Sequence, residues 1–120
     1  MGAIIDGAGI EIDATLLAEL LASEGDPRAE VIDVREAHER EAGHIEGTRH
    51  VSLVELSGAV ATIERDRPVV FYCRVGARSQ MAAEAFRSAG FDAYTLVGGL
   101  LQWVAEGRAL VPDGGYVADH

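Results

Sequence analysis

The sequence predicts an α/β fold in which a parallel sheet carries helices on both faces. Short apolar runs typical of buried strands alternate along the chain with segments whose apolar residues recur at helical spacing. This alternation is typical of parallel sheets, because their consecutive strands are joined by helices. A chain of 120 residues is long enough for one hydrophobic core and too short for two, so we expect one domain.

Residues 10–27 are predicted to form the first strand and the first helix. Residues 10–12 alternate like a short strand, and Asp13 can cap the helix that follows. The apolar face of that helix consists of Leu16, Leu17, Leu20 and Leu21. Gly25 and Pro27 are expected to end it.

Two further strands and two helical segments are predicted within residues 31–63. Residues 31–34 have the character of a buried strand, and a short charged helix at residues 36–41 follows, which Gly43 ends. Val51 belongs to another short strand. The apolar residues that then recur at helical spacing are Leu53, Leu56, Val60 and Ile63.

The second half of the chain repeats the pattern of strand and helix twice. Residues 69–72 form the most hydrophobic strand-like run, and Cys73 follows it directly. The next helix ends at Gly90, and its apolar face is marked by Ala82, Ala85, Phe86 and Ala89. Residues 94–97 supply another strand, after which Gly98 and Gly99 turn into a last helix that carries Leu100, Leu101 and Val104.

The charge of the chain narrows its partners. A net charge of −10 makes nucleic acid an unfavourable partner, because nucleic acids are bound chiefly through basic residues. Residues 1–46 hold twelve acidic residues and three arginines, which leaves −9 there and −1 in the remainder. This acidic half either serves solubility or forms a docking face for a basic protein partner. Without an apolar run long enough for a membrane span or a secretion signal, we expect a cytoplasmic protein with no membrane anchor.

Two further features of composition exclude classes of chemistry. All ten basic residues are arginine, and the absence of lysine removes Schiff-base chemistry, including covalent pyridoxal phosphate. The single cysteine excludes an internal disulfide, and its spacing from the four histidines matches no zinc finger. We therefore expect neither a metal nor a cofactor.

The segment from Cys73 to Ser79 carries the clearest chemical signal. It joins a buried strand to a helix, so its backbone N–H groups can converge on the cysteine sulfur as an anion-binding nest. The helix N-terminus and two arginines favour the thiolate, which is the nucleophilic form. A cysteine that merely packs in the core is the alternative, but packing gives no reason for the polar residues that follow. Cys73 is predicted to be the nucleophile, cradled by Arg74, Val75, Gly76, Ala77, Arg78 and Ser79.

The string CRVGARS resembles the active-site loop of the rhodanese-like domain family. Other segments resemble landmarks of that family in the expected order: residues 31–36, residues 43–47, the glycine pair at 98–99, Trp103 and Gly107. The resemblance implies a three-layer domain over residues 10–111, with a central, mostly parallel, five-stranded sheet. Residues 1–9 are then an N-terminal extension and residues 112–120 a C-terminal tail, which we expect to be ragged.

The resemblance also implies the chemistry of a thiosulfate sulfurtransferase. Cys73 would take a sulfane sulfur from thiosulfate or a persulfide and pass it to a thiol or cyanide, which must come from outside because no second cysteine exists. Asp33 and Arg35 would brace the active-site loop. Two prolines frequent in the family are replaced by Glu46 and Ser52, and the acids at residues 36–41 would repel an anionic donor.

The role of Arg78 and two alternative functions stay open at this point. Arg78 can orient the oxyanions of a donor, or it can pair with a carboxylate such as Asp33 or Glu84. A cysteine phosphatase or arsenate reductase is a second enzyme class, although phosphatases place five residues between cysteine and arginine, and this chain has four. A non-enzymatic binding or sulfur-relay module is the third reading. His44 is expected to be structural, because a persulfide mechanism needs no base once the thiol is ionised.

Overall fold

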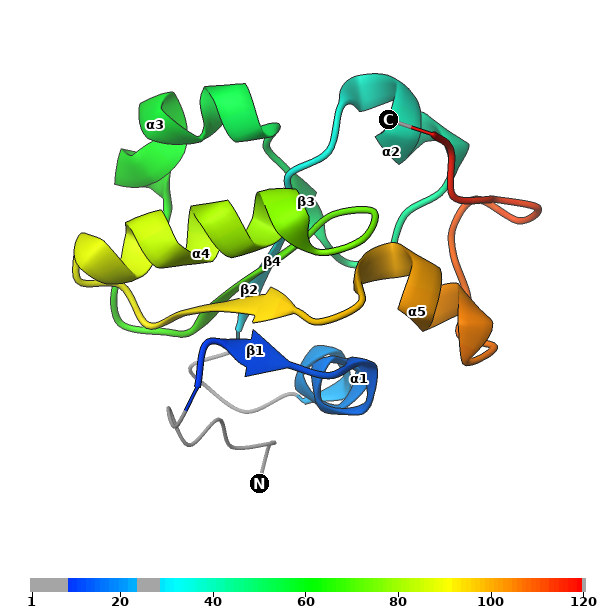
Figure 1. Cartoon of the computed structure of the whole chain (residues 1–120), viewed down its shortest axis with the longest axis horizontal. Helices are drawn as coiled ribbons and strands as arrows, with labels where there is room; N and C mark the ends of the chain where they lie inside the picture. The colour runs from blue at the N-terminus through cyan, green and yellow to red at the C-terminus, as the bar shows by residue number, and fades with distance from the viewer. Residues whose placement is uncertain (1–8, 24–28, 120) are drawn as a thin grey trace.

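The five strands form one parallel sheet, in the order β1-β5-β4-β2-β3, which confirms the predicted fold class (Figure 1). The computed structural model describes residues 9–23 and 29–119. The strands are β1 (Glu11–Ile12), β2 (Glu30–Asp33), β3 (Arg49–His50), β4 (Val69–Tyr72) and β5 (Ala93–Leu96). Because all strands run the same way, the segments that follow β2, β4 and β5 meet at one edge of the sheet.

Helices cover both faces of the sheet and give it two cores. They are α1 (Ala14–Ala22), α2 (Ala37–Ala42), α3 (Leu56–Ala59), α4 (Ala77–Ser88) and α5 (Gly99–Ala105). One core contains Phe71 of β4 with Phe86 of α4, and the other contains Tyr72 of β4 with Leu17 of α1 and Leu100 of α5. Figure 1 shows α3 and α4 on one side of the strands and α1 on the other. The side chains of β4 alternate between the two cores, and Cys73 continues the alternation on the α4 side.

The helix predicted over residues 53–63 is broken rather than continuous. It consists of a 3₁₀ turn, η1 (Leu53–Glu55), then α3, then a second 3₁₀ turn, η2 (Val60–Thr62). Ser52 and Glu55 close a capping box at the start of η1. Leu56 and Ile63 are buried in the core. These two side chains hold the segment in place, although it has no continuous helix with a regular apolar face.

The buried face of α4 also differs from the predicted one. Ser79, Ala82, Ala83 and Phe86 are buried, whereas Ala85 and Ala89 are exposed. Alanine is compatible with either side of a helix, so the sequence pattern was ambiguous. The buried face begins at Ser79, so the first turn of α4 is packed against the rest of the domain.

Strands β2 and β5 begin and end one residue earlier than predicted, whereas two predicted helix ends are confirmed. Asp13 caps α1 as expected, since its side chain accepts a hydrogen bond from the N–H of Leu16 at 2.8 Å. The C-cap of α1 is Ser23, while Gly25 and Pro27 lie outside the described residues. Gly43 is the C-cap of α2, as predicted.

Residues 111–119, expected to be ragged, fold back onto α2. Val111 and His44 form an antiparallel bridge, and the N–H of Tyr116 donates to the carbonyl of Ala42 at 3.0 Å. A Cβ on Gly43 would lie 2.7 Å from the backbone nitrogen of Tyr116, so this close approach requires glycine. None of the helices in the described ranges is both long and apolar enough to cross a membrane.

Candidate active site

Cys73 lies directly after β4 and is fully buried beneath its own loop. The backbone N–H of Gly76 donates a hydrogen bond to Sγ at 3.1 Å, and Oγ of Ser79 lies 3.5 Å from the same sulfur. Gly76 has a φ of +114°, a conformation that L side chains rarely adopt, which explains glycine at this turn. One backbone N–H at the start of α4 therefore contacts the sulfur, and the predicted nest of several converging N–H groups stays a prediction.

The start of α5 holds the other side of the loop. Gly98 and Gly99 both have positive φ, and a Cβ on Gly99 would lie 2.5 Å from the carbonyl oxygen of Arg74. This close packing lets the first N–H groups of α5 bind loop carbonyls. Leu100 N–H donates to the carbonyl of Cys73 at 2.9 Å, and Leu101 N–H donates to that of Arg74 at 3.1 Å. The glycine pair thus helps to position the loop. From the sequence it was predicted to begin the last helix, which is confirmed, and it was also a landmark of the resemblance.

Ser79 ties the loop to the sheet from the first turn of α4. Its buried hydroxyl donates to the carbonyl of Gly76 at 3.2 Å and lies 2.7 Å from Oγ1 of Thr95 on β5. Since Ser79 also contacts Sγ, it connects the sulfur to the neighbouring strand. Thr95 is a residue of the site that sequence reasoning missed, because only the pairing of β4 with β5 brings it near the loop.

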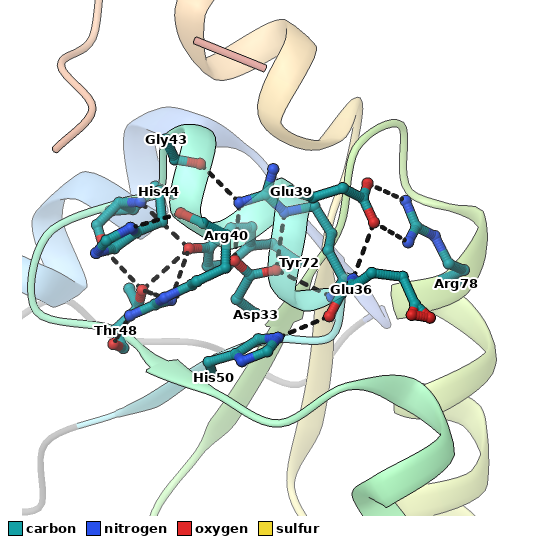
Figure 2. A network of polar contacts seen from close by, with 12 residues as sticks. Asp33, Glu36, Glu39, Arg40, Gly43, His44, Thr48, His50, Tyr72 and Arg78 are labelled. Atoms are coloured by element: carbon teal, nitrogen blue, oxygen red, sulfur yellow. Dashed lines mark hydrogen bonds and ion pairs between the residues drawn. The ribbon is translucent and has the colours of Figure 1, made fainter. Parts of the chain in front are cut away.

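Arg78 does not stand free beside Cys73 but forms a two-point ion pair with Glu39 of α2. Nη1 and Nη2 donate to the two carboxylate oxygens at 2.8 and 2.9 Å, and Figure 2 shows the two side chains meeting end to end. The partner is neither of the two carboxylates predicted, Asp33 and Glu84. Glu39 was predicted only as one of several surface acids repelling a donor. It is instead fully buried and charge-compensated.

The electrostatics of Glu39 follow from this pairing. Burial by itself raises the pKa of its carboxyl. The hydrogen bonds from Arg78 and from the backbone of Glu36, together with the positive charges of Arg78 and Arg35, outweigh burial and place the pKa below its ordinary value. Glu39 is therefore ionised at neutral pH. Its other role is local: with Glu36 it forms the capping box that starts α2.

Asp33 and Arg35 form a buried ion pair at the end of β2. Nε and Nη2 of Arg35 donate to the carboxylate of Asp33 at 2.9 and 2.8 Å, and Nη2 also donates to the carbonyl of Gly43 at 2.8 Å. The pair therefore joins the two ends of α2. It reaches the Cys73 loop through α2 and the contact between Glu39 and Arg78 (Figure 2). A bracing role that acts through α2 stays a prediction.

Comparison with known proteins agrees with this geometry. The family model described as "Rhodanese-like domain" matches residues 13–106. The chain belongs to the rhodanese-like domain family. It is 42% identical over 77 residues to YqhL of Bacillus subtilis, covering 63% of this chain and 61% of that protein. It is 38% identical over 76 residues to the thiosulfate sulfurtransferase GlpE of Pseudomonas aeruginosa, covering 62% of this chain and 69% of GlpE.

Solved structures show the same fold. A rhodanese-related protein from Thermoplasma volcanium superimposes with a TM-score of 0.77 at 29% identity, covering 86% of this chain and 98% of that one. Because the chain spans 61% of YqhL, less than two thirds, the likeness there concerns the domain rather than the whole protein.

The remaining polar residues of this rhodanese-like domain hold its framework. Nδ1 of His44 lies 3.0 Å from the carbonyl of Arg40, and Nε2 of His50 lies 2.7 Å from that of Arg35. These contacts agree with the structural role expected of His44. Arg74 lies at the loop entrance, where Nη2 is 3.3 Å from Oδ1 of Asp119 in the C-terminal segment. Within the described ranges, no group of three or more histidine, cysteine or acidic residues could hold a metal ion.

The hydroxyl of Tyr72 is buried in the same framework, which gives it an unusual titration. Burial, reinforced by the negative charge of Asp33, raises the pKa of Tyr72 to about 12 from an ordinary value of 10.0, although hydrogen bonds with Thr48 and Ile45 oppose the shift. A folded-state pKa above the unfolded value stabilises the fold below pH 10, and that contribution is lost as the pH rises toward 12.

We therefore expect the free energy of unfolding to fall by about 2 to 3 kcal/mol between pH 10 and pH 12 because of Tyr72. Urea unfolding at several pH values measures this slope. Tyr72→Phe should flatten it, whereas Tyr116→Phe, at an exposed position, should keep the wild-type slope. Equal slopes in wild type and Tyr72→Phe would show that the hydroxyl titrates in a wetter environment than the structure has.

Proposed function

We propose that this rhodanese-like domain is a sulfurtransferase that moves a sulfane sulfur from a donor to an external thiol or to cyanide through a persulfide on Cys73. The observation that carries the proposal is the position of the only cysteine, at the end of β4 with the N–H of Gly76 on its sulfur. The name of GlpE, a thiosulfate sulfurtransferase, supports the reaction class. The loop residues 74–79 form the cradle for the transferred sulfur.

The reaction divides into two displacements on sulfur. The Cys73 thiolate attacks the outer sulfur of the donor, a new S–S bond forms, and the donor's S–S bond breaks with its electron pair leaving on sulfite or on a thiolate. A thiol or cyanide then attacks the outer sulfur, and the Cys73 thiolate leaves. The two steps exchange sulfur without an external oxidant or reductant. The N–H of Gly76 is placed to donate a hydrogen bond to the sulfur of Cys73 in both steps.

The decisive test is the intact mass of the protein after incubation with thiosulfate or with a small organic persulfide. We expect a gain of about 32 Da, one sulfur, that a reductant reverses. Since Cys73 has no exposed surface, the residues that cover it must move for the donor to enter, so the time course should be followed. An unchanged mass with every donor would favour the non-enzymatic alternative instead.

The same preparation distinguishes the phosphatase alternative. A phosphoryl group needs hydrogen-bond donors around all its oxygens. The loop places only four residues between Cys73 and Arg78, and the guanidinium of Arg78 is bound to Glu39. Hydrolysis of an aryl phosphate should therefore stay at background. Rapid hydrolysis without sulfur uptake would reverse the assignment.

A further inference from the structure

We propose that Glu39 determines the donor preference of this domain, because it occupies Arg78 and thereby selects an organic persulfide over thiosulfate. This inference rests on the proposed sulfurtransferase function and deepens it. Thiosulfate presents a charged sulfonate group that must be held while its outer sulfur is attacked. A persulfide presents an organic group in the same place. The two donors therefore need different protein groups beside Cys73.

The charge of Arg78, in the loop that follows Cys73, is already neutralised. Both terminal nitrogens of Arg78 are used by Glu39, in the planar two-point arrangement that a sulfonate would otherwise take. The Arg78 side chain keeps 23% of its surface exposed, whereas Glu39 keeps none. Transferring Arg78 to a donor would leave the Glu39 carboxylate buried without its main partner, which is strongly unfavourable. Arg78 is thus a poor site for an anionic donor in this chain.

Of the other two arginines near the loop, Arg35 is unavailable to a donor and Arg74 is held only weakly by its own partner. Arg35 is fully buried and paired with Asp33. Arg74 is paired with Asp119, whose side chain is 95% exposed, so this contact is weak and screened by salt. Arg74 therefore offers an anionic donor a solvent-screened contact only, in place of the two-point pair that Arg78 would give.

The surface beside the loop is suited to an organic group. Val75 and Val97 are exposed, and both line a hollow of about 290 Å³ that also borders Gly76, whose N–H is bonded to Sγ. Glu11 and Gln80 also line the hollow, so its lining is mixed and carries a negative rather than a positive charge. Leu101, one turn into α5, adds a further exposed apolar side chain whose backbone is bonded to Arg74. Apolar surface of this kind lowers the free energy of an alkyl group and not of a sulfonate.

The test measures the rate at which each donor transfers sulfur to Cys73. The intact mass of the protein reports this transfer directly, so no acceptor is needed. The probes are thiosulfate and the persulfide of 2-mercaptoethanol, whose organic part is neutral. The wild-type protein should be loaded faster by the persulfide. Glu39→Gln keeps the shape and one acceptor oxygen but removes the charge that holds Arg78. It should raise the ratio of the thiosulfate to the persulfide rate constant by about tenfold, because Arg78 gains a charged partner in thiosulfate.

Two further variants test whether a change in the ratio comes from Arg78 or from a general disturbance of the fold. Asp119→Asn removes an exposed charge that is paired only weakly with Arg74, so it should change the ratio by less than about twofold. The double variant Glu39→Gln with Arg78→Gln replaces the ion pair by two neutral amides. If Glu39 withholds Arg78 from the donor, the double variant should keep the wild-type ratio within about twofold.

The outcomes separate this inference from the proposed function. Loading of the wild type by thiosulfate as fast as by the persulfide, or a collapse of the ratio in the double variant, would show that Arg78 binds the donor and would overturn the role of Glu39. Those results would leave the sulfurtransferase assignment in place. Failure of both donors to load Cys73 would overturn the function and this inference together.

Discussion

Cys73→Ser should abolish sulfur transfer, with a loss of roughly a thousandfold or more, because a serine hydroxyl neither forms a persulfide nor ionises at neutral pH. The exchange is small, and the serine hydroxyl can accept the N–H of Gly76 as the sulfur does. The stability of the domain should therefore change by no more than about 1 kcal/mol. The loss of activity is measured as transfer of sulfur to cyanide, and the loss of the persulfide as the intact mass. Thermal unfolding measures the stability.

The matched control for this variant is Ser57→Ala, at an exposed position on α3 away from the loop. It should retain wild-type transfer and wild-type stability. A Cys73→Ser protein that folds and keeps most of its transferase activity would show that another group carries the sulfur. No other thiol exists in the chain, so the persulfide mechanism itself would then be wrong.

Arg35→Met should destabilise the fold by about 3 to 5 kcal/mol, because it leaves the Asp33 carboxylate buried without its main partner. Arg35 is fully buried and also donates to the carbonyl of Gly43, so the variant loosens both ends of α2. Glu39 lies on this helix, and its contact with Arg78 should weaken as well. Urea unfolding measures the free energy of unfolding. The ratio of the thiosulfate to the persulfide rate constant reports the weakened contact between Glu39 and Arg78.

The ion pair between Arg49 and Glu30 is the matched control, because it joins β3 to β2 at a more exposed place. Arg49→Met should cost about 0 to 1 kcal/mol, the usual range for exposed pairs. Replacing both Asp33 and Arg35 by apolar residues should recover part of the loss, since no buried charge then remains. If Arg35→Met costs no more than Arg49→Met, burial of the pair does not matter to the fold.

Local sequence signals were sufficient for the strand, loop and helix around Cys73. The apolar run of β4, the cysteine directly after it and the glycine at position 76 each act over a few residues, through side-chain burial or backbone conformation. The same holds for the Asp13 cap and the Gly43 end of α2. The order of these elements also indicated the parallel sheet, because consecutive strands alternated with helices.

The partners of the loop, in contrast, were decided by the tertiary structure. Arg78 and Glu39 are 39 positions apart and meet because β2 and β4 are neighbours in the sheet, which brings α2 beside the start of α4. The pairing of β4 with β5 places Thr95 beside Ser79, and the packing of Gly99 on Arg74 places α5 against the loop. A carboxylate or hydroxyl has the same local signature wherever it lies. The pairing of distant strands therefore determines whether such a group is solvated at the surface or, like Glu39, buried as the partner of an arginine in the loop after β4.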